Sequence, residues 1–279
     1  MTSDPNQFQS INSFQNVGPN DPMMRQSIQI TEPVYVQSIN QNANQIQNPN
    51  LVPAQSQDPA EEDQKQEPIN GVGVITFENG TKFEGELKMS IPQGFGKFTY
   101  ANGETYEGDV AGGNVNGKGV YHFANGDVYE GEFQNGVKSG KGKLIWGNGN
   151  AYEGDFQNDN PNGLGLYHYS NNDQYEGEFI NGKAEGEGKY FYSSGGIYQG
   201  QFKNNKFNGK GTFWGTQGEI YEGDWKDNKK NGAGVILYSN GDKYQGTWIM
   251  GKKDGPSYLY DPSGQLIKQE IWANGVKQG

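Results

Sequence analysis

The sequence lacks cysteine altogether and has only two histidines among its 279 residues. Without cysteine the chain has no disulfides and no thiolate metal sites, and this favours the cytoplasm as its location. No apolar run approaches the ~20 residues that span a bilayer. The first residues also show no basic-then-apolar signal pattern, so we expect neither a membrane span nor secretion.

Aliphatic residues are also scarce. Hydrophobic residues make up 32% of the chain, which is low for a globular protein, whereas aromatic residues reach 13% and glycine occurs 44 times. A chain of this composition can bury enough surface only if large rings cover most of its interior.

The charge is acidic overall and unevenly distributed. The formal net charge is −11 and the isoelectric point is about 4.7. Residues 1–70 contain 2 basic and 8 acidic residues, residues 71–190 contain 9 and 17, and residues 191–279 contain 11 and 8. An acidic surface argues against nucleic-acid binding. The basic C-terminal third leaves an anionic partner possible.

Two short motifs recur in a fixed register of 23 residues. The first begins with an aromatic residue, at Phe83, Tyr106, Tyr129, Tyr152, Tyr175, Tyr198, Tyr221 and Tyr244. The second is Gly-x-Gly, beginning at Gly71, Gly94, Gly117, Gly140, Gly163, Gly186, Gly209 and Gly232. A period in this range is typical of solenoids and other arrayed folds.

Within each repeat the period falls to two, which predicts half-buried strands. The alternation places aromatic residues and glycines on one face and charged residues on the other. A ring such as Tyr106 can then lie across Gly119 on the neighbouring strand and cover its bare backbone. Asn-Gly pairs such as Asn125-Gly126 predict two-residue type I′ hairpins. The alternate connection, 134–139, is predicted to be longer.

The motifs Tyr129-Glu130-Gly131-Glu132-Phe133 and Gly140-Lys141-Gly142, repeated over residues 71–260, resemble the MORN repeat (membrane occupation and recognition nexus). The resemblance implies an all-β fold: an elongated, single-layer antiparallel meander of stacked β-hairpin repeats whose aromatic face forms a shallow groove. Family members are mostly non-enzymatic scaffolds of cytoskeletal structures, cilia and flagella, including radial-spoke-like assemblies, and of membrane junctions; some are linked to phosphoinositides.

We divide the chain into an Asn/Gln-rich tail, 1–68, and a repeat array, 69–279, with a degenerate closing strand near 265–272. The tail has no periodicity and many prolines, so it is expected to be disordered. One patch, 28–39, alternates apolar residues and could pair as a strand with a sheet edge or a partner. Chance accounts for such a short match more readily.

Catalytic and metal sites are disfavoured. Glu107 and Asp109 are spaced like paired carboxylates, but every repeat carries such a pair on a face expected to be wet. His122 and His168 fall two repeats apart, too far to share a metal. The stretch 158–163 lacks the Glu of a calcium loop. We therefore expect no enzyme, no metal and no cofactor.

Three surfaces are candidates for binding. A peptide or helix of a partner protein could lie in the aromatic groove, lined by Tyr106, Tyr129, Tyr152, Tyr175, Tyr198 and Tyr221. The alternative, which we expect for most of these rings, is that they only cover one another and the glycines. An acidic protein or anionic lipid could bind a stripe of turn lysines, formed by Lys203, Lys206, Lys226, Lys229, Lys230, Lys252 and Lys253. The open sheet ends, near 72–77 and 266–272, could pair with another chain or a second copy.

The sequence thus predicts a stiff, non-enzymatic scaffold or docking rod, 80–90 Å long at about eighteen strands and ~4.8 Å per strand. By resemblance it would serve a cytoskeletal or ciliary assembly in the cytoplasm. The alternative is an adaptor that lies peripherally at membranes and binds anionic lipid of the phosphoinositide type through the lysine edge.

Overall fold

The structure, a computed structural model, describes residues 67–279. The tail and its apolar patch at 28–39 therefore lie outside the described residues, apart from residues 67 and 68. Within the described part every regular element is a strand. In chain order the strands are β1 (Gly71–Thr76), β2 (Lys82–Lys88), β3 (Ile91–Thr99), β4 (Thr105–Ala111), β5 (Asn114–His122), β6 (Val128–Gln134), β7 (Val137–Ile145), β8 (Ala151–Gln157), β9 (Asn160–His168), β10 (Gln174–Ile180), β11 (Lys183–Phe191), β12 (Ile197–Lys203), β13 (Lys206–Trp214), β14 (Ile220–Lys226), β15 (Lys229–Leu237), β16 (Lys243–Ile249), β17 (Lys252–Lys253), β18 (Gly255–Tyr260), β19 (Leu266–Ala273) and β20 (Val276–Gln278).

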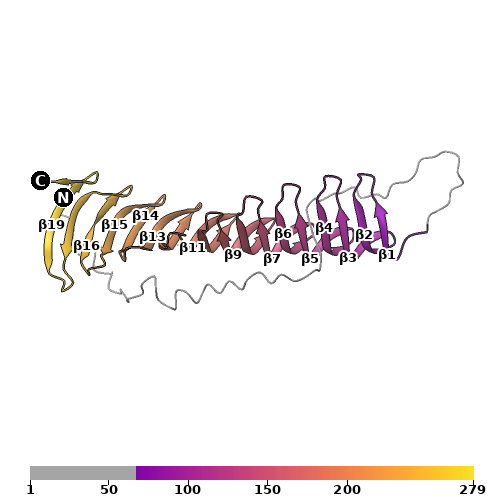
Figure 1. Cartoon of the computed structure of the whole chain (residues 1–279), viewed down its shortest axis with the longest axis horizontal. Helices are drawn as coiled ribbons and strands as arrows, with labels where there is room; N and C mark the ends of the chain where they lie inside the picture. The colour runs from indigo at the N-terminus through magenta and orange to yellow at the C-terminus, as the bar shows by residue number, and fades with distance from the viewer. Residues whose placement is uncertain (1–66) are drawn as a thin grey trace.

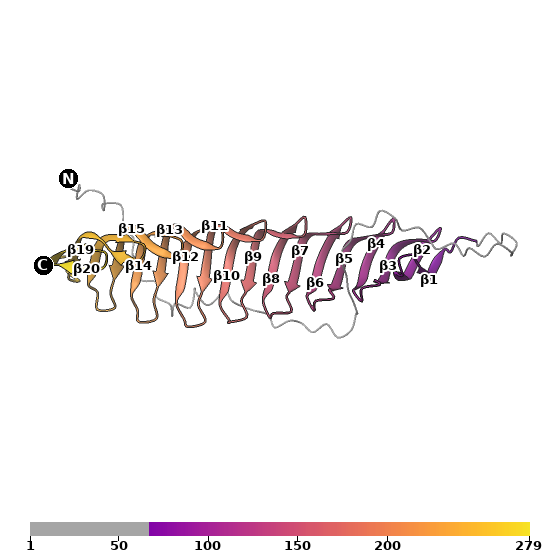
Figure 2. The ribbon, with the colours of Figure 1, turned by 90° about the horizontal axis from the view of Figure 1, so that it is seen from above.

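The strands form one open antiparallel meander. Each strand pairs with the next in the chain, as β1 does with β2 and β9 with β10, except that β16 pairs with both β17 and β18 and these two do not pair with each other. The result is a long ribbon with β1 at one end and β19 and β20 at the other (Figures 1 and 2). The single-layer all-β fold predicted from the repeat is confirmed, with 20 strands where about eighteen were expected.

The strand register brings rings and glycines to one face, as predicted. Tyr106 lies opposite Tyr121 and Gly108 lies opposite Gly119. The Tyr106 ring covers Gly119 so closely that a Cβ there would lie 2.8 Å from Cε2 of the ring. Any side chain at this glycine would displace the tyrosine, so the Gly-x-Gly motif is explained by ring packing.

A ladder of rings runs along this face. Tyr129 packs edge-on against Phe133 at 5.0 Å between centroids and against Phe156 of the next repeat at 4.9 Å; Phe156 in turn packs against Tyr152 at 5.1 Å. Such pairs stabilise by roughly 0.5–1.5 kcal/mol each beyond their buried area. The buried Tyr129 hydroxyl donates to the carbonyl oxygen of Glu132 at 3.0 Å. Each repeat therefore packs against the next through its rings, and the sheet needs no second layer to bury them.

The two kinds of turn are the reverse of what the sequence predicted. The connection expected to be longer is the two-residue hairpin, because Asn135 and Gly136 both have positive φ, 50° and 84°, between the paired residues Gln134 and Val137. At Asn125-Gly126 only Gly126 has positive φ, 86°. There the Asn125 side chain accepts a hydrogen bond from Asp127 N at 3.1 Å, which holds a wider turn. The Asx bond, rather than a second left-handed residue, shapes this turn.

Candidate functional site

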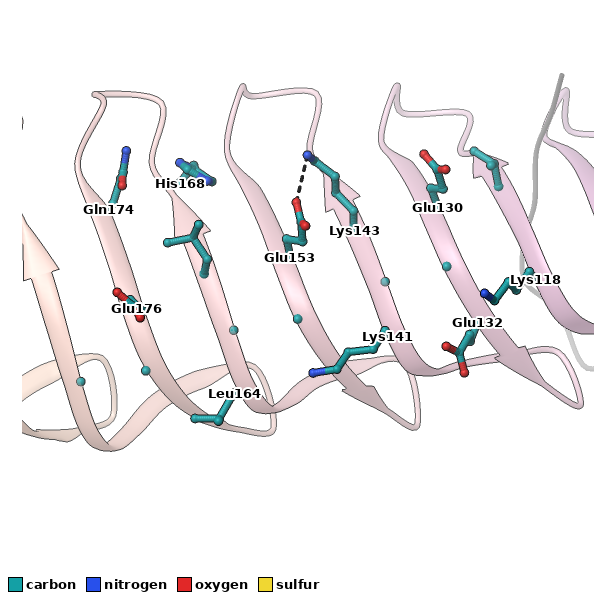
Figure 3. A pocket seen from close by; sticks show the side chains of 18 of the residues that line it. Lys118, Glu130, Glu132, Lys141, Lys143, Glu153, Leu164, His168, Gln174 and Glu176 are labelled. Carbon is teal, nitrogen blue, oxygen red and sulfur yellow. Dashed lines mark ion pairs between the residues drawn. The ribbon is translucent and has the colours of Figure 1, made fainter. Parts of the chain in front are cut away.

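The face opposite the rings contains an open trough of about 1220 Å³. Its floor is bare glycine backbone, because the side chains that flank each glycine diverge to the two sides. Lys143 and Glu153 stand on one side of this floor, and Glu132 and Lys141 stand on the other (Figure 3). The residues that line the trough lie on β3 to β12, about nine strand spacings or ~43 Å.

The exposure of the floor defines where the trough begins and ends. The central glycines of this face are half-buried at Gly119, Gly131, Gly142, Gly154, Gly165, Gly177 and Gly188. Next to this stretch the equivalent glycines are buried, at Gly96 and Gly108 before it and at Gly200 after it; farther out Gly223, Gly234 and Gly246 are buried, whereas Gly73, Gly85 and Gly211 are half-buried. The middle of the array is therefore the longest stretch of the described chain in which consecutive central glycines are all half-buried.

Acidic groups outnumber basic ones around the trough. Six glutamates line it, against four lysines and one histidine. Lys143 bonds Glu153 at 3.0 Å, and Lys97 bonds Glu107 at 3.5 Å. Burial raises the pKa of Glu107, and Lys97 opposes this shift. Such half-exposed ion pairs contribute little to stability, so the trough keeps a negative charge that a basic ligand would complement.

The second acid of each repeat has a structural function that the sequence did not reveal. Asp109 lies at a β-bulge, where its Oδ2 accepts the backbone N–H of Lys118 at 2.8 Å and lies beside Gly117, whose φ is 74°. Asp155 binds Leu164 N in the same way, at 3.1 Å. These acids hold the bulge that separates the trough floor from the neighbouring turns. They were predicted only as charges on a wet face.

The arrangement offers no constellation for metal chemistry in the described part of the chain, where three or more metal-ligating side chains never cluster. His168 lines the trough and His122 is exposed outside it. Burial chiefly lowers the pKa of His168, and Lys143 adds to the shift. Among residues 67–279 no helix is long and apolar enough to cross a membrane.

The burial of the rings corrects the prediction that the aromatic face is an open groove. The six tyrosines assigned to it are 0 or 1% exposed, namely Tyr106, Tyr129, Tyr152, Tyr175, Tyr198 and Tyr221. Each is covered by the glycines of its own hairpin and by rings of the adjoining repeats. They form a core rather than an open surface, so the hollow that could hold a partner lies on the other face.

The predicted lysine edge divides into two groups. Five of its lysines are exposed in the two-residue turns or beside them, namely Lys203, Lys206, Lys226, Lys229 and Lys252. Lys206 bonds Asp227 at 2.9 Å. Lys230 and Lys253 instead turn inward over Tyr221 and Tyr244, with Nζ 4.4 and 3.7 Å from the ring centroids. Burial chiefly lowers the pKa of both, and neither belongs to the edge.

The sheet ends are β1 and β20. On its outer side β1 pairs with no strand of the described chain, and Val72 there is 85% exposed. Gly73 has Ile69 beside it where other repeats place an aromatic ring. At the other end the predicted terminal strand, 266–272, is not the last one, because β20 pairs with β19.

Comparison with known proteins gives one family. The MORN repeat model matches nine consecutive segments, 68–82, 83–105, 106–128, 129–151, 152–174, 175–197, 198–220, 221–243 and 244–264. None of the curated proteins matches this sequence.

Among solved structures, the TCP10 domain of Danio rerio CPAP, in complex with a peptide of Danio rerio STIL, is 15% identical with a TM-score of 0.42; the match covers 71% of this chain and 93% of that one. The TCP domain of Drosophila melanogaster SAS-4 (dCPAP), in complex with a proline-rich motif, is 14% identical with a TM-score of 0.38; that match covers 64% and 90%. Scores this low carry no conclusion about the function of this chain.

Proposed function

Because the chain belongs to the MORN repeat family, we propose that it is a non-enzymatic docking rod that binds a segment of another protein in its glycine-floored trough. The observation that carries this proposal is the continuous half-exposed floor between Gly119 and Gly188, flanked by charged side chains. Domains normally cover a sheet face with a second layer. A bound segment would supply that layer here.

The rod's construction supports such a function. The ring ladder supports the sheet from the opposite face, so the trough is formed before a partner arrives. A preformed site loses less conformational entropy on binding than one that must be ordered. The trough is also open along its length, which suits an extended segment better than a small molecule, since small-molecule sites enclose most of their ligand.

Site-specific photo-crosslinking tests the location. Leu164 is 63% exposed inside the trough, and Ile180 is 54% exposed at the ribbon edge, so the two form a matched pair of exposed apolar positions. A photoreactive residue at position 164 should capture a discrete partner segment that mass spectrometry identifies, whereas position 180 should not. Equal capture at both positions, or capture of the same segment at 180 alone, would contradict docking in the trough.

The assembly that the rod serves is proposed to be cytoskeletal or ciliary, as the family resemblance implies. A fluorescently tagged full-length chain should then decorate filaments or axonemes in cells. Staining that depends on the lysine edge and follows membranes would count against this setting.

A second candidate function is membrane association through the exposed lysines. The fixed repeat stacks the turns of β12–β13 and β14–β15 about 10 Å apart, and these turns carry Lys203, Lys206, Lys226 and Lys229. Each lysine near an anionic surface contributes about 1 kcal/mol. Co-sedimentation with phosphoinositide vesicles should fall when these four lysines become glutamine. Unchanged co-sedimentation would exclude this edge.

A further inference from the structure

A row of five glutamates runs along the trough face in steps of one repeat: Glu84, Glu107, Glu130, Glu153 and Glu176. Between each two consecutive members lies one residue of the intervening strand, directly paired with both. We call these four intervening positions slots. They are occupied by Lys97, Val120, Lys143 and Leu166.

The chain's own lysines occupy alternate slots. Lys97 lies between Glu84 and Glu107 and bonds Glu107 at 3.5 Å. Lys143, two repeats on, lies between Glu130 and Glu153 and bonds Glu153 at 3.0 Å. In these slots a cation with an aliphatic stem already lies between two carboxylates.

The remaining two slots hold aliphatic residues, each between two glutamates of the same row. Val120 is paired with Glu107 and Glu130, and Leu166 is paired with Glu153 and Glu176. Both apolar side chains line the trough. Glu130 and Glu176 are exposed and form no ion pair within the described residues. Each slot thus offers an apolar base with a carboxylate on either side.

We propose that the slots at Val120 and Leu166 are two sockets for basic side chains of the segment that docks in the trough, an inference that rests on the proposed docking function. The aliphatic stem of an arginine or lysine would pack on Val120 or Leu166, and its charged head would lie between the flanking carboxylates. The partner would place its cations where Lys97 and Lys143 place theirs.

The distance between the sockets specifies the partner segment. Val120 on β5 and Leu166 on β9 are four strands apart, which is ~19 Å. In an extended segment, residues six apart span ~20 Å and face the same side. In a helix, a ~19 Å separation corresponds to about 13 residues, which lie on nearly opposite faces. The sockets therefore fit an extended segment with two basic residues six positions apart.

The equivalent positions farther along the array form no third site of this kind. Lys189 occupies the next slot of the trough. The slot after that, Thr212, lies between Gln199 and Glu222, and Val235 lies between Glu222 and Gln245. The replacement of glutamate by Gln199 and Gln245 removes one carboxylate from each of these slots. The two sockets are thus confined to the open trough.

Lysine substitutions at Val120 and Leu166 should block both sockets. Lysine is the native residue in equivalent slots, so V120K/L166K should fold while filling both sockets from within. T212K makes the same change outside the trough and is the matched control. The probe is a labelled synthetic peptide with two arginines six positions apart in an otherwise neutral sequence. A second peptide has its arginines three apart, and thermal unfolding checks the fold of every variant.

We expect the six-spaced peptide to bind the native chain more tightly than the three-spaced one by at least tenfold. V120K/L166K should weaken its binding by tenfold or more, each single variant by severalfold, and T212K not at all. E130Q/E176Q should weaken it without filling the sockets.

Equal binding to the native chain and V120K/L166K, equal affinity of the two peptides, or no binding to the native chain overturns the inference. The cross-linking at position 164 tests docking independently of the sockets. If a partner segment is captured there and its binding is insensitive to V120K/L166K, docking in the trough is supported and the sockets are excluded.

Discussion

The middle of the array and its C-terminal part are built from the same repeat and yet differ on the face opposite the rings. In the middle the glycine floor is half-exposed between charged side chains. From β12 onward the glycines are mostly buried, and apolar residues occupy the same face: Val235 is 0% and Ile197 is 9% exposed. The positions equivalent to Ile197 in the two preceding repeats are Ala151 and Gln174.

This difference separates two kinds of position in the repeat. The leading aromatic and the glycines recur in both regions and set the ribbon and its ring ladder, whereas Gln201 and Thr247 replace the bulge acid in two C-terminal repeats. The residues between them decide whether the opposite face is open or filled. The repeat therefore specifies the rod, and the intervening positions specify where along the rod a partner can bind.

The ring ladder should be equally necessary in both regions. Tyr152→Ala in the middle and Tyr221→Ala in the C-terminal part each remove a fully buried ring, and we expect a loss of about 3–5 kcal/mol of unfolding free energy for each. Chemical denaturation followed by tryptophan fluorescence measures both. A much smaller loss for Tyr152→Ala would mean that the two regions differ on the ring face too, and would break the comparison.

Lysine at a slot position should be tolerated in the open trough and harmful where the C-terminal face is fully buried, as it is at Val235. Val235→Lys places a charge in a site that is 0% exposed and should cost on the order of 3 kcal/mol. Val120→Lys adds a charge beside Glu107 and Glu130 at the edge of the trough and should remain within about 0.5 kcal/mol. Thermal unfolding of both variants is the measurement. Similar losses would show that the trough is no more open than the C-terminal face.

The fold could be predicted from the sequence because the same residue types recur at the same positions of every repeat. The alternation of Tyr106, Gly108 and Val110 determined one face, and the fixed period determined the order of strands. The sequence did not predict the turns, because Asn125-Gly126 can form either a type I′ hairpin or a wider turn. The hydrogen bond that the Asn125 side chain accepts from Asp127 N favours the wider turn, together with the backbone bond from Phe123 N to Asp127 O.

The location of the candidate site was harder to predict. The rings were expected to cover one another and the glycines but to keep one side free for a partner, because the sheet has a single layer. Phe133 and Phe156 of successive repeats instead enclose Tyr129. The signal for the trough was nevertheless present in the sequence. Lysine and aliphatic residues alternate from repeat to repeat at one position, as at Lys97, Val120 and Lys143. This position therefore has a period of two repeats, whereas the motifs have a period of one. Only the register shows that these residues face pairs of carboxylates.

The bulge acid should have a similar, intermediate effect in both regions. Asp155→Ala and Asp224→Ala each leave a backbone N–H, of Leu164 and Ala233, without its acceptor. We expect each to cost about 1–3 kcal/mol. Hydrogen exchange at the two amides measures the local effect directly. A cost confined to Asp155 would mean that the bulge supports the trough alone and not the ribbon as a whole.

The smallest effect is expected where the C-terminal end differs from the N-terminal one. Glu270 on β19 bonds Lys268 at 2.5 Å and Lys277 on β20 at 3.1 Å, whereas β1 has no equivalent outer strand in the described chain. These two partners lower the pKa of Glu270 from its ordinary value of 4.5 to about 2. Because the folded pKa is the lower one, the stabilisation is fully present above about pH 4.5 and is lost as the pH falls toward 2.

Hydrogen exchange of the amides in β20 should therefore accelerate over this pH window. The amides in β1 should show only the intrinsic pH dependence of exchange. Glu270→Gln should remove the acceleration, and an equal acceleration in that variant would assign the fraying of β20 to other groups.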